Sequence, residues 1–413
     1  MEQLEKRKVG ALQRIQELYR LGDSEYLEAA EPVEKESTIK AESKSPTPEQ
    51  VDRYGNIRDD VGLLNMGFYK ISKDLSLQKE SNSFRLGKKL IGRDDLSKYI
   101  KESVFSPMTN EPEKDQQLLS ERELSRIEKW KHMCTIHFES GNQLHSFPIT
   151  KKLIQRTMKG IPDCWRSIAW WSFLMNDCPD PDLVNYYYEL CDKICEYDVQ
   201  IDLDVPRTAA THFLFRKRYN GGQRLLFRVL HSVALYLPQV GYVQGMASIA
   251  ATLLIYYPEE IAFIMMVNML QRRGMGDLFS CGFDVLLNAF DNLKSELQYL
   301  PSGKHLSNIG AEPSAFATRW YLTIFHQCVP FHTQLRIWDL LFLLGGNEGQ
   351  TIRLLQASSL ALIRGMWDTL MDADFEIVMQ ALSGIIPIQN DDAYLARIQH
   401  YWQKMPSELA MKK

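Results

Sequence analysis

Several sequence signals of catalysis and membrane insertion are missing from this 413-residue chain. It contains no Gly-x-x-x-x-Gly-Lys-Ser/Thr phosphate loop, no His-Glu-x-x-His zinc motif and no Gly-x-Ser-x-Gly nucleophile elbow. No run approaches the roughly 20 apolar residues of a membrane-spanning helix, and the first residues are charged. We therefore expect no nucleotide, metal or acyl intermediate of its own, no transmembrane segment and a cytoplasmic location, with peripheral attachment to an endomembrane left open.

Cysteine and net charge narrow the classes of partner. The seven cysteines are scattered, and only Cys191 and Cys195 lie close together. Since no second Cys/His pair is nearby, reduced structural thiols are favoured over metal or redox use. The net charge of −4 provides no overall basic field, which argues against nucleic acid as a partner. A structural role is also expected for four histidines that lack metal-site spacing: His212, His231, His326 and His332.

Strand-type alternation is scarce, and no fixed-period repeat is present. After Lys151, by contrast, segments with helical periodicity follow one another, separated by short breaks such as Pro179-Asp180-Pro181 and Gly345-Gly346. This pattern predicts an all-α fold, with one large multi-helix domain over residues 150–400 and a tail over residues 401–413.

Residues 1–149 differ from the rest of the chain in composition and periodicity. Residues 1–22 are expected to form an amphipathic helix, which packs back on the main domain or, alternatively, binds a partner or a membrane surface. Residues 23–50 are rich in Glu, Lys, Ser, Thr and Pro and predict a disordered linker. Residues 51–149 are expected to be a partly ordered extension with a helix near residues 116–138.

Two polar side chains have chemistry that GTP hydrolysis often lacks. A guanidinium such as that of Arg207 can neutralise charge on a transferring phosphoryl group, and an amide such as that of Gln244 can orient an attacking water. Because Pro206 biases the preceding residue toward extended geometry, we expect Arg207 to leave a turn at a helix start. Judged by spacing alone, a solvated or structural salt bridge is favoured for Arg207, and Gln244 gives a weaker functional signal still.

Residues next to Arg207 and Gln244 could hold these two side chains at the protein surface. Asp204 and Thr208 could cap free amides or hold the guanidinium of Arg207 without occupying all five of its donors. Gly241 and Gly245 flank the Gln244 segment and allow a close approach of another backbone.

Three motifs follow one another along the chain, and a further segment agrees with them. They are Gly160-Ile161-Pro162 with Arg166 and Trp170, Ile201-x-x-Asp204-x-x-Arg207-Thr208, and Tyr242-x-Gln244-Gly245, with Leu335-Arg336-Ile337-Trp338-Asp339 beyond them. Their ordered combination resembles the TBC-domain family, the GTPase-activating proteins for Rab-type small GTPases. The resemblance covers about residues 150–390, and Asp52-Arg53-Tyr54-Gly55 is similar to a segment upstream of the domain in some members.

This resemblance implies a TBC-type fold and a mechanism. Arg207 would be an arginine finger and Gln244 a glutamine finger, both supplied in trans to a GTP-bound Rab-type GTPase, thereby regulating vesicle traffic. GTP and Mg²⁺ would belong to that partner, so no cofactor of the chain's own is expected. The resemblance also implies that five further residues support the site or contact the GTPase: Asp204, Thr208, Arg166, Tyr242 and Gly245. The alternative is a TBC-like scaffold that binds a small GTPase or trafficking partner without accelerating hydrolysis.

Overall fold

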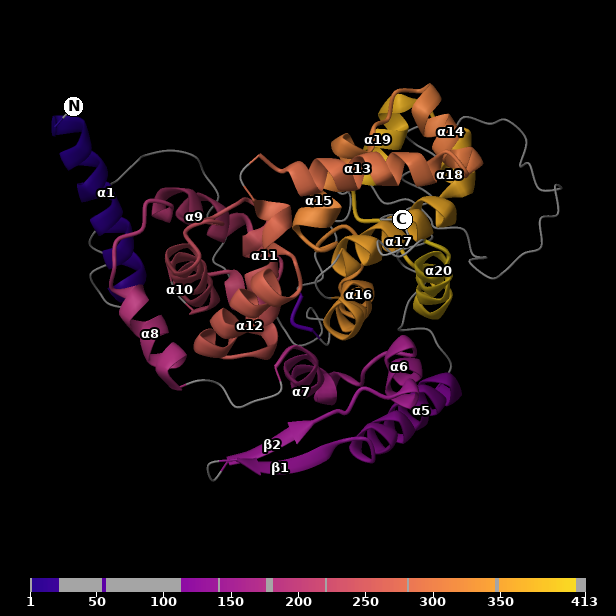
Figure 1. The fold of residues 1–413 in the computed structure, drawn as a ribbon, viewed down its shortest axis with the longest axis horizontal. Helices are drawn as coiled ribbons and strands as arrows, with labels where there is room; N and C mark the ends of the chain where they lie inside the picture. The colour runs from indigo at the N-terminus through magenta and orange to yellow at the C-terminus, as the bar shows by residue number, and fades with distance from the viewer. Residues whose placement is uncertain are drawn as a thin grey trace, which may run out of the picture. The chain divides into compact units, whose positions relative to one another are not determined.

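The computed structural model describes residues 2–21, 54–56, 113–139, 142–175, 181–219, 221–280, 282–345 and 349–405 (Figure 1). The chain forms two compact units. Unit 1 comprises residues 1–62 and 179–267, and unit 2 comprises residues 63–178 and 268–413. The predicted linker 23–50 lies outside the described residues, as do most of the 51–149 extension and the end of the 401–413 tail.

The fold is all-α, which confirms the prediction from helical periodicity. Among the described residues, the only sheet is a two-stranded hairpin. No helix in the described ranges combines the length and apolar character needed to cross a lipid bilayer.

Unit 1 contains the N-terminal helix and a group of central helices. Its elements are α1 (Glu2–Leu21), α8 (Pro181–Cys191), α9 (Asp198–Asp204), the 3₁₀ turns η2 (Val205–Arg207) and η3 (Phe213–Phe215), α10 (Gly221–Tyr236), α11 (Met246–Tyr256) and α12 (Glu259–Arg272), which ends in unit 2.

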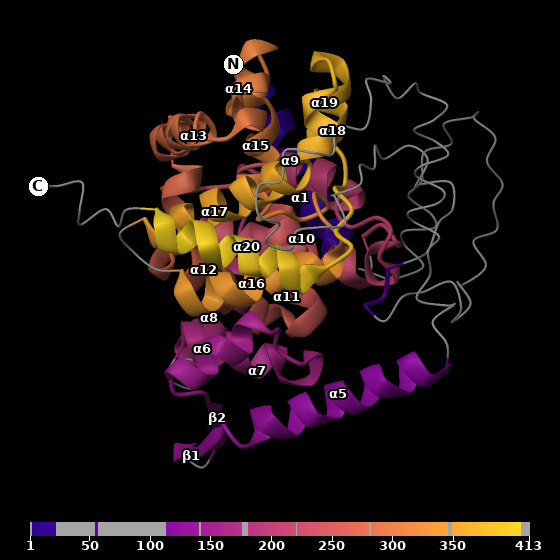
Figure 2. The ribbon, with the colours of Figure 1, turned by 90° about the vertical axis from the view of Figure 1, so that its right-hand side faces the viewer.

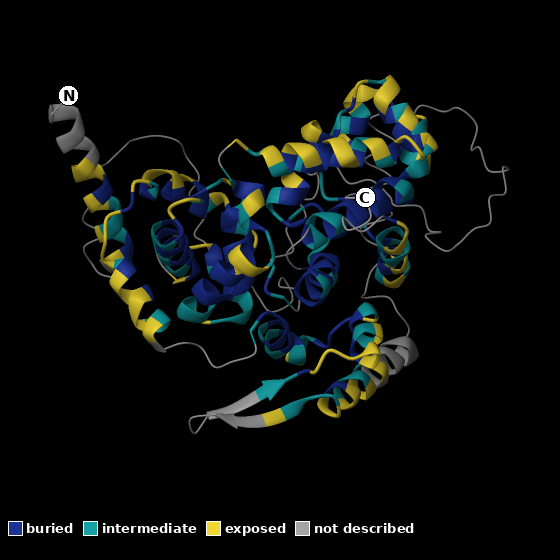
Figure 3. Cartoon of the chain, in the orientation of Figure 1, coloured by how far each residue is buried: buried dark blue, intermediate teal, exposed yellow. Residues whose placement is uncertain are grey.

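The core of unit 1 forms around α10 and α11, which pack against each other. Helix α11 is apolar on nearly all sides and is therefore buried along most of its length, as the dark blue ribbon in Figure 3 shows. Helix α10 also packs against α8, α9 and α1. The expected helix at the N-terminus is thus present as α1, and it packs back on the helical core.

Unit 2 begins with a helix and a hairpin and continues as a helical assembly. Its elements are α5 (Glu113–Lys131), β1 (Thr135–Glu139), β2 (Asn142–Ser146), α6 (Lys151–Met158), α7 (Asp163–Leu174), η4 (Gly276–Phe279), α13 (Asp284–Leu297), α14 (Pro301–Asn308), α15 (Pro313–Leu322), α16 (Phe331–Leu344), α17 (Gln350–Gly365), α18 (Trp367–Met371), α19 (Phe375–Ser383) and α20 (Asp391–Lys404).

Helix α16 is the centre of unit 2. It is buried from Thr333 to Leu343 except at Arg336, and it packs against α6, α7, α17 and α20. Figure 2 shows α16, α17 and α20 stacked side by side. On α16, Trp338 and Phe342 lie against Trp170 of α7, with ring centroids 5.7 and 4.8 Å from that of Trp170.

The predicted helix over residues 116–138 was wrong at its C-terminal end. Helix α5 ends at Lys131, and Thr135–Glu139 pairs antiparallel with Asn142–Ser146. The sequence shows the reason, because Thr135 and Ile136 are β-branched, which favours a strand over a helix. The hydroxyl of Thr135 also contacts that of Ser146 across the hairpin at 2.8 Å.

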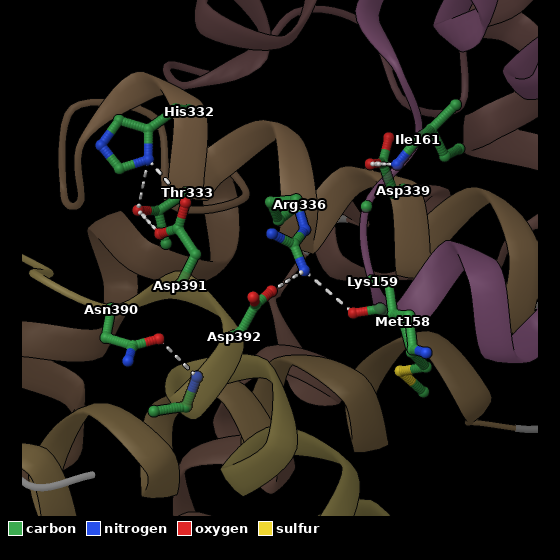
Figure 4. Close-up of polar contacts among 12 residues, drawn as sticks. Met158, Lys159, Ile161, His332, Thr333, Arg336, Asp339, Asn390, Asp391 and Asp392 are labelled. Atoms are coloured by element: carbon green, nitrogen blue, oxygen red, sulfur yellow. Dashed lines mark hydrogen bonds and ion pairs between the residues drawn. The ribbon is translucent and has the colours of Figure 1, made fainter. Parts of the chain in front are cut away.

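A buried carboxylate ties the start of α7 to α16. Asp339 is fully buried and accepts hydrogen bonds from the Ile161 amide at 3.2 Å, the Arg166 guanidinium at 3.1 Å and the Trp170 indole at 2.9 Å. Figure 4 shows the contact between Asp339 and Ile161. Burial raises the pKa of Asp339, while Arg166 and Trp170 oppose that shift. One side chain thereby joins segments that are far apart in the sequence.

We expect Asp339→Asn to destabilise the protein strongly. The substitution leaves the buried Arg166 guanidinium without its buried counter-ion, and removing one partner of such a pair typically costs roughly 3 to 5 kcal/mol. The partly exposed Asp163, which also pairs with Arg166, places the loss toward the lower end. Urea unfolding of the full chain measures it.

The matched control is Asp392→Asn. Asp392 pairs with Arg336 at 3.0 Å, but its side chain is 80% exposed (Figure 4). An exposed pair contributes about 1 kcal/mol or less. Equal losses in the two variants would contradict the role assigned to Asp339.

Candidate functional site

Arg207 lies at the C-terminal end of α9, where the helix tightens into the turn Val205–Arg207. The prediction that it leaves a turn at a helix start was wrong, because Val205 adopts helical angles (φ −54°, ψ −49°) despite preceding a proline. Val205 is completely buried, so its packing outweighs the local bias toward extended geometry. The Arg207 side chain is 60% exposed and so remains accessible.

The carboxylate of Asp204 holds the two predicted segments together. One oxygen forms an ion pair with the Arg207 guanidinium, and the other accepts a 2.6 Å hydrogen bond from the Tyr242 hydroxyl. Asp204 itself is buried, as is Thr208, whose hydroxyl donates to the Asp204 carbonyl at 2.8 Å. The site therefore rests on three buried side chains, those of Asp204, Thr208 and Tyr242.

The Tyr242 hydroxyl is a reliable donor in this arrangement. Burial raises the pKa of the Tyr242 phenol above its ordinary value, and the hydrogen bond and negative charge of Asp204 raise it further. The phenol therefore stays protonated at neutral pH. It can donate to Asp204 without adding a second negative charge beside it.

Gln244 lies on the irregular segment between α10 and α11, and its side chain is exposed. Among the described residues, its amide has no hydrogen-bond partner. Gly245 follows it as the first residue before α11, with a φ of +112° that side chains with a Cβ rarely adopt. This glycine allows the chain to turn from the Gln244 segment directly into the buried helix.

A second contact fixes the same segment at the other end of α9. Gly241 has a φ of +60°, and a Cβ there would lie 2.5 Å from the hydroxyl of Tyr197. Tyr197 is the N-cap residue of α9. The Gln244 segment thus contacts the start of α9 through Gly241 and its end through Tyr242.

Arg207 and Gln244 therefore belong to one structural arrangement within unit 1. One provides an exposed planar cation with several donors, and the other an exposed amide that can both donate and accept. Among the described residues, the one group of side chains that could hold a metal ion, Cys195, Asp198 and His231, includes neither of them. A guanidinium and an amide of this kind can act on a phosphoryl group and a water.

A model of the family described as Rab-GTPase-TBC domain matches residues 163–371. The chain belongs to this family. It is 69% identical over 402 residues to a TBC domain-containing protein of Schizosaccharomyces pombe, covering 97% of this chain and 96% of that protein. It is also 32% identical over 256 residues to the Rab GTPase-activating protein tbc-11 of Caenorhabditis elegans, covering 60% of this chain and 26% of that longer protein.

Solved TBC structures share the fold. The Ypt/Rab-GAP domain of Gyp1p superimposes with a TM-score of 0.55 at 18% identity, covering 70% of this chain and 99% of that domain. A flagellar RabGAP TBC domain of Chlamydomonas superimposes with a TM-score of 0.53 at 23% identity, covering 71% and 97% of the two chains. At these identities the comparison shows the fold alone.

In this TBC protein, Arg166 is placed differently from the other predicted site residues. It lies in unit 2, is buried, and is held by Asp339, Asp163 and the Ile161 carbonyl. Its burial does not support contact with a GTPase. Arg166 has a structural role in joining α7 to α16.

A Cys195–Asp198–His231 cluster is buried in unit 1, and its three groups are of types that can bind metals. The His231 Nδ1 and an Asp198 oxygen are 2.6 Å apart, which is a hydrogen-bond distance. Two ligands of one zinc ion, each at about 2.0–2.2 Å and tetrahedral, would lie further apart than this. His231 Nε2 also contacts the Leu190 carbonyl at 3.0 Å, so the ring is held at both nitrogens. The geometry indicates a structural hydrogen-bonded pair.

Sequence reasoning named Asp204 but missed Tyr197, Asp198 and Asp202. The signal was the recurrence of aspartate in Asp198–Asp204, a helix with three buried carboxylates at Asp198, Asp202 and Asp204. Buried carboxylates need donors from elsewhere in the fold, so this pattern marks a helix that several segments hold.

We expect Tyr242→Phe to lower the free energy of unfolding. It removes only the hydroxyl that donates to the buried Asp204 carboxylate, and the loss of a hydrogen bond to a charged group costs about 1.5 to 3 kcal/mol. Arg207 remains as a partner of Asp204, which favours the smaller value. Urea unfolding of the full chain measures the change.

The control is Tyr236→Phe on α10. The Tyr236 ring packs edge-on against Phe263, and its hydroxyl has no hydrogen bond among the described residues. A change within about 0.5 kcal/mol is expected. A loss in this control as large as that in Tyr242→Phe would remove the special status of the Asp204 contact.

Proposed function

We propose that this protein accelerates GTP hydrolysis by a Rab-type small GTPase. Membership of the Rab-GTPase-TBC family supports the proposal, as does the name of its relative tbc-11, a Rab GTPase-activating protein. The observation that carries it is the joint presentation of Arg207 and Gln244, both exposed and both fixed to α9.

Arg207 serves as the arginine finger. Its guanidinium is held through a single nitrogen, Nη2, by one oxygen of Asp204, so other donors of the fork stay available. Contact with Asp204 restricts the orientation of a long side chain that would otherwise lose entropy on docking. In the GTPase active site, the free donors neutralise charge that develops on the phosphoryl oxygens.

Gln244 serves as the glutamine finger. Its amide accepts a hydrogen bond from the attacking water and donates one toward the phosphate, so it replaces the glutamine with which many GTPases orient water themselves. The turn at Gly245 and the buried helix α11 hold the segment in place. A rigid presentation matters because misplacement by about 1 Å can cost on the order of 100-fold in rate.

The nucleotide and its Mg²⁺ belong to the GTP-bound partner in this proposal. The chain contributes positioning and charge, and it holds neither the nucleophile nor the leaving group. Through this activity the protein would end the GTP-bound state of its partner on an endomembrane and so regulate vesicle traffic.

The second candidate function is a scaffold that binds a small GTPase without accelerating hydrolysis. Loss of either finger would be the simplest route to such a protein. Both are present and exposed here, which favours the catalytic proposal.

The test is single-turnover GTP hydrolysis by a panel of GTP-loaded Rab-type GTPases with the wild-type protein and its variants. Removing an arginine finger typically costs a factor of about 10³ to 10⁵ in rate, or roughly 4 to 7 kcal/mol. We expect Arg207→Ala to abolish acceleration and Arg207→Lys to restore little, because an ammonium group lacks the planar fork. Gln244→Ala should also reduce the rate strongly.

The control variant is Arg122→Ala, which removes an exposed arginine of α5 in unit 2. It should retain the wild-type rate. Full activity of Arg207→Ala would refute the finger assignment, and acceleration of no GTPase by the wild-type protein would favour the scaffold.

A further inference from the structure

Helix α9 is too short to hold its own orientation. It has seven residues, and isolated helices shorter than about 12 residues are marginal in water. Its direction is therefore set by tertiary contacts, and these contacts also set where the following turn presents Arg207. Each of its three buried aspartates is held by a side chain from another part of unit 1: Asp198 by His231, Asp202 by Tyr19 and Asp204 by Tyr242.

The contact at Asp202 comes from the N-terminal helix. The Tyr19 hydroxyl donates to one oxygen of Asp202 at 2.8 Å, and Arg218 reaches the other oxygen at 3.2 Å. The Tyr19 side chain is almost fully buried, and its ring stacks on Phe227 with centroids 3.9 Å apart. Tyr219 meets the same ring edge-on at 4.9 Å. Tyr19 thus fills a specific position between α9 and α10.

Two polar contacts fix α1 at this position. Arg224 of α10 donates through Nε to the Tyr19 carbonyl at 2.8 Å. One turn earlier, the Gln16 amide donates to the Lys193 carbonyl at 2.7 Å, just beyond the end of α8. The indigo helix α1 (Figure 1) accordingly packs against α9 and α10.

A second N-terminal segment contacts the chain beyond the arginine. Asn56 forms an antiparallel bridge with His212, and the Phe213 amide donates to the Gly55 carbonyl at 3.0 Å. The Tyr54 carbonyl lies 2.7 Å from the His212 ring nitrogen Nε2. Gly55 has a φ of +90°, and a Cβ there would lie 2.6 Å from that ring. Residues 198–213, called the finger segment below, are therefore held on both sides of Arg207.

The N-terminal residues that make these contacts, Tyr19 and residues 54–56, lie outside the part of the chain that matches the family model, residues 163–371. We propose that Tyr19 is a positioning residue for Arg207: through Asp202 it fixes α9, so that the N-terminal helix is part of the structure that presents the arginine finger. This inference rests on the proposed function for its effect on hydrolysis. Its effect on the finger segment can be measured without any GTPase.

Asp202 lies close to Arg207 along the chain, so a shift of Asp202 moves Arg207. The two residues are about one and a half helical turns apart, on a short helix and turn whose position depends on packing against α1 and α10. Loss of the Tyr19 hydroxyl leaves Asp202 to Arg218, whose side chain is 53% exposed, beside the contacts at Asp198 and Asp204. The latter carboxylate also pairs with the finger itself, so motion of α9 is transmitted directly to Arg207.

The decisive variant is Tyr19→Phe in the full chain. It keeps the stacked ring and removes only the hydroxyl, so α1 should remain folded against α10. Hydrogen exchange should become faster by roughly tenfold at the amides of residues 198–208, as expected from loss of one hydrogen bond to a charged group. The control is Arg20→Ala, which changes an exposed neighbour on the same helix and should leave this exchange unaltered.

The same variants are then compared in single-turnover hydrolysis at increasing concentrations of the protein. Imperfect presentation of the finger lowers the rate at saturation, whereas the concentration needed for half-maximal rate should change little. We expect Tyr19→Phe to lower the saturating rate by roughly three- to tenfold, in proportion to the lost positioning. Arg20→Ala should match the wild type.

The outcomes separate the two proposals. Unchanged exchange at residues 198–208 in Tyr19→Phe overturns the positioning role, whatever the activity. Faster exchange with an unchanged saturating rate overturns it as well, because α9 would then move without affecting Arg207. Faster exchange in a protein that accelerates no GTPase supports the hold on the finger segment and contradicts the proposed function instead.

Discussion

The carboxylate of Asp204 is the constraint on which the site depends. It is buried, and it cannot remain so without donors, because an unpaired buried charge is costly. Its two oxygens face Arg207 and the Tyr242 hydroxyl, which come from the two separate segments that carry Arg207 and Gln244. The requirement to satisfy one buried charge thereby fixes the arginine segment relative to the glutamine segment.

Unit 2 also contains a buried carboxylate that joins separate segments, and here its role is structural. Asp339 on α16 collects donors from Ile161, Arg166 and Trp170, which all lie near the start of α7. The two carboxylates differ in what they leave exposed. Around Asp339 every partner is turned inward, whereas Asp204 holds an arginine whose side chain is largely in solvent. The Asp204 pair therefore differs from the Asp339 pair in leaving its arginine accessible.

Much of this could be predicted from the sequence, and the failures have physical causes. Helical periodicity predicted the all-α fold, since α11 and α16 are long apolar segments without strand alternation. The helix end near residue 138 was missed because strand propensity at Thr135 and Ile136 competes with a helical pattern that reaches Trp130. The local bias of Pro206 suggested an extended Val205, but complete burial of that side chain imposed helical angles.

The site residues show the same division. Arg207 and Gln244 could be selected through the resemblance of their ordered motifs to the TBC-domain family, whereas their chemistry and spacing alone did not single them out. Arg166 could not be distinguished from them, since a motif does not say whether its arginine is buried. The role of Tyr19 could not be predicted from the sequence, for a different reason. Its contact with Asp202 joins residues 183 positions apart in the sequence, and no local pattern encodes such a pairing.

The central claim is that Arg207 and Gln244 act together on the transition state of a partner's reaction. Its most direct test is binding to a GTPase that carries GDP and aluminium fluoride, which imitates the transferring phosphoryl group, compared with binding to the GDP form. The account predicts a stable complex only with aluminium fluoride, lost in both Arg207→Ala and Gln244→Ala. Equal binding to the two nucleotide states, or a complex unaffected by either substitution, would contradict it.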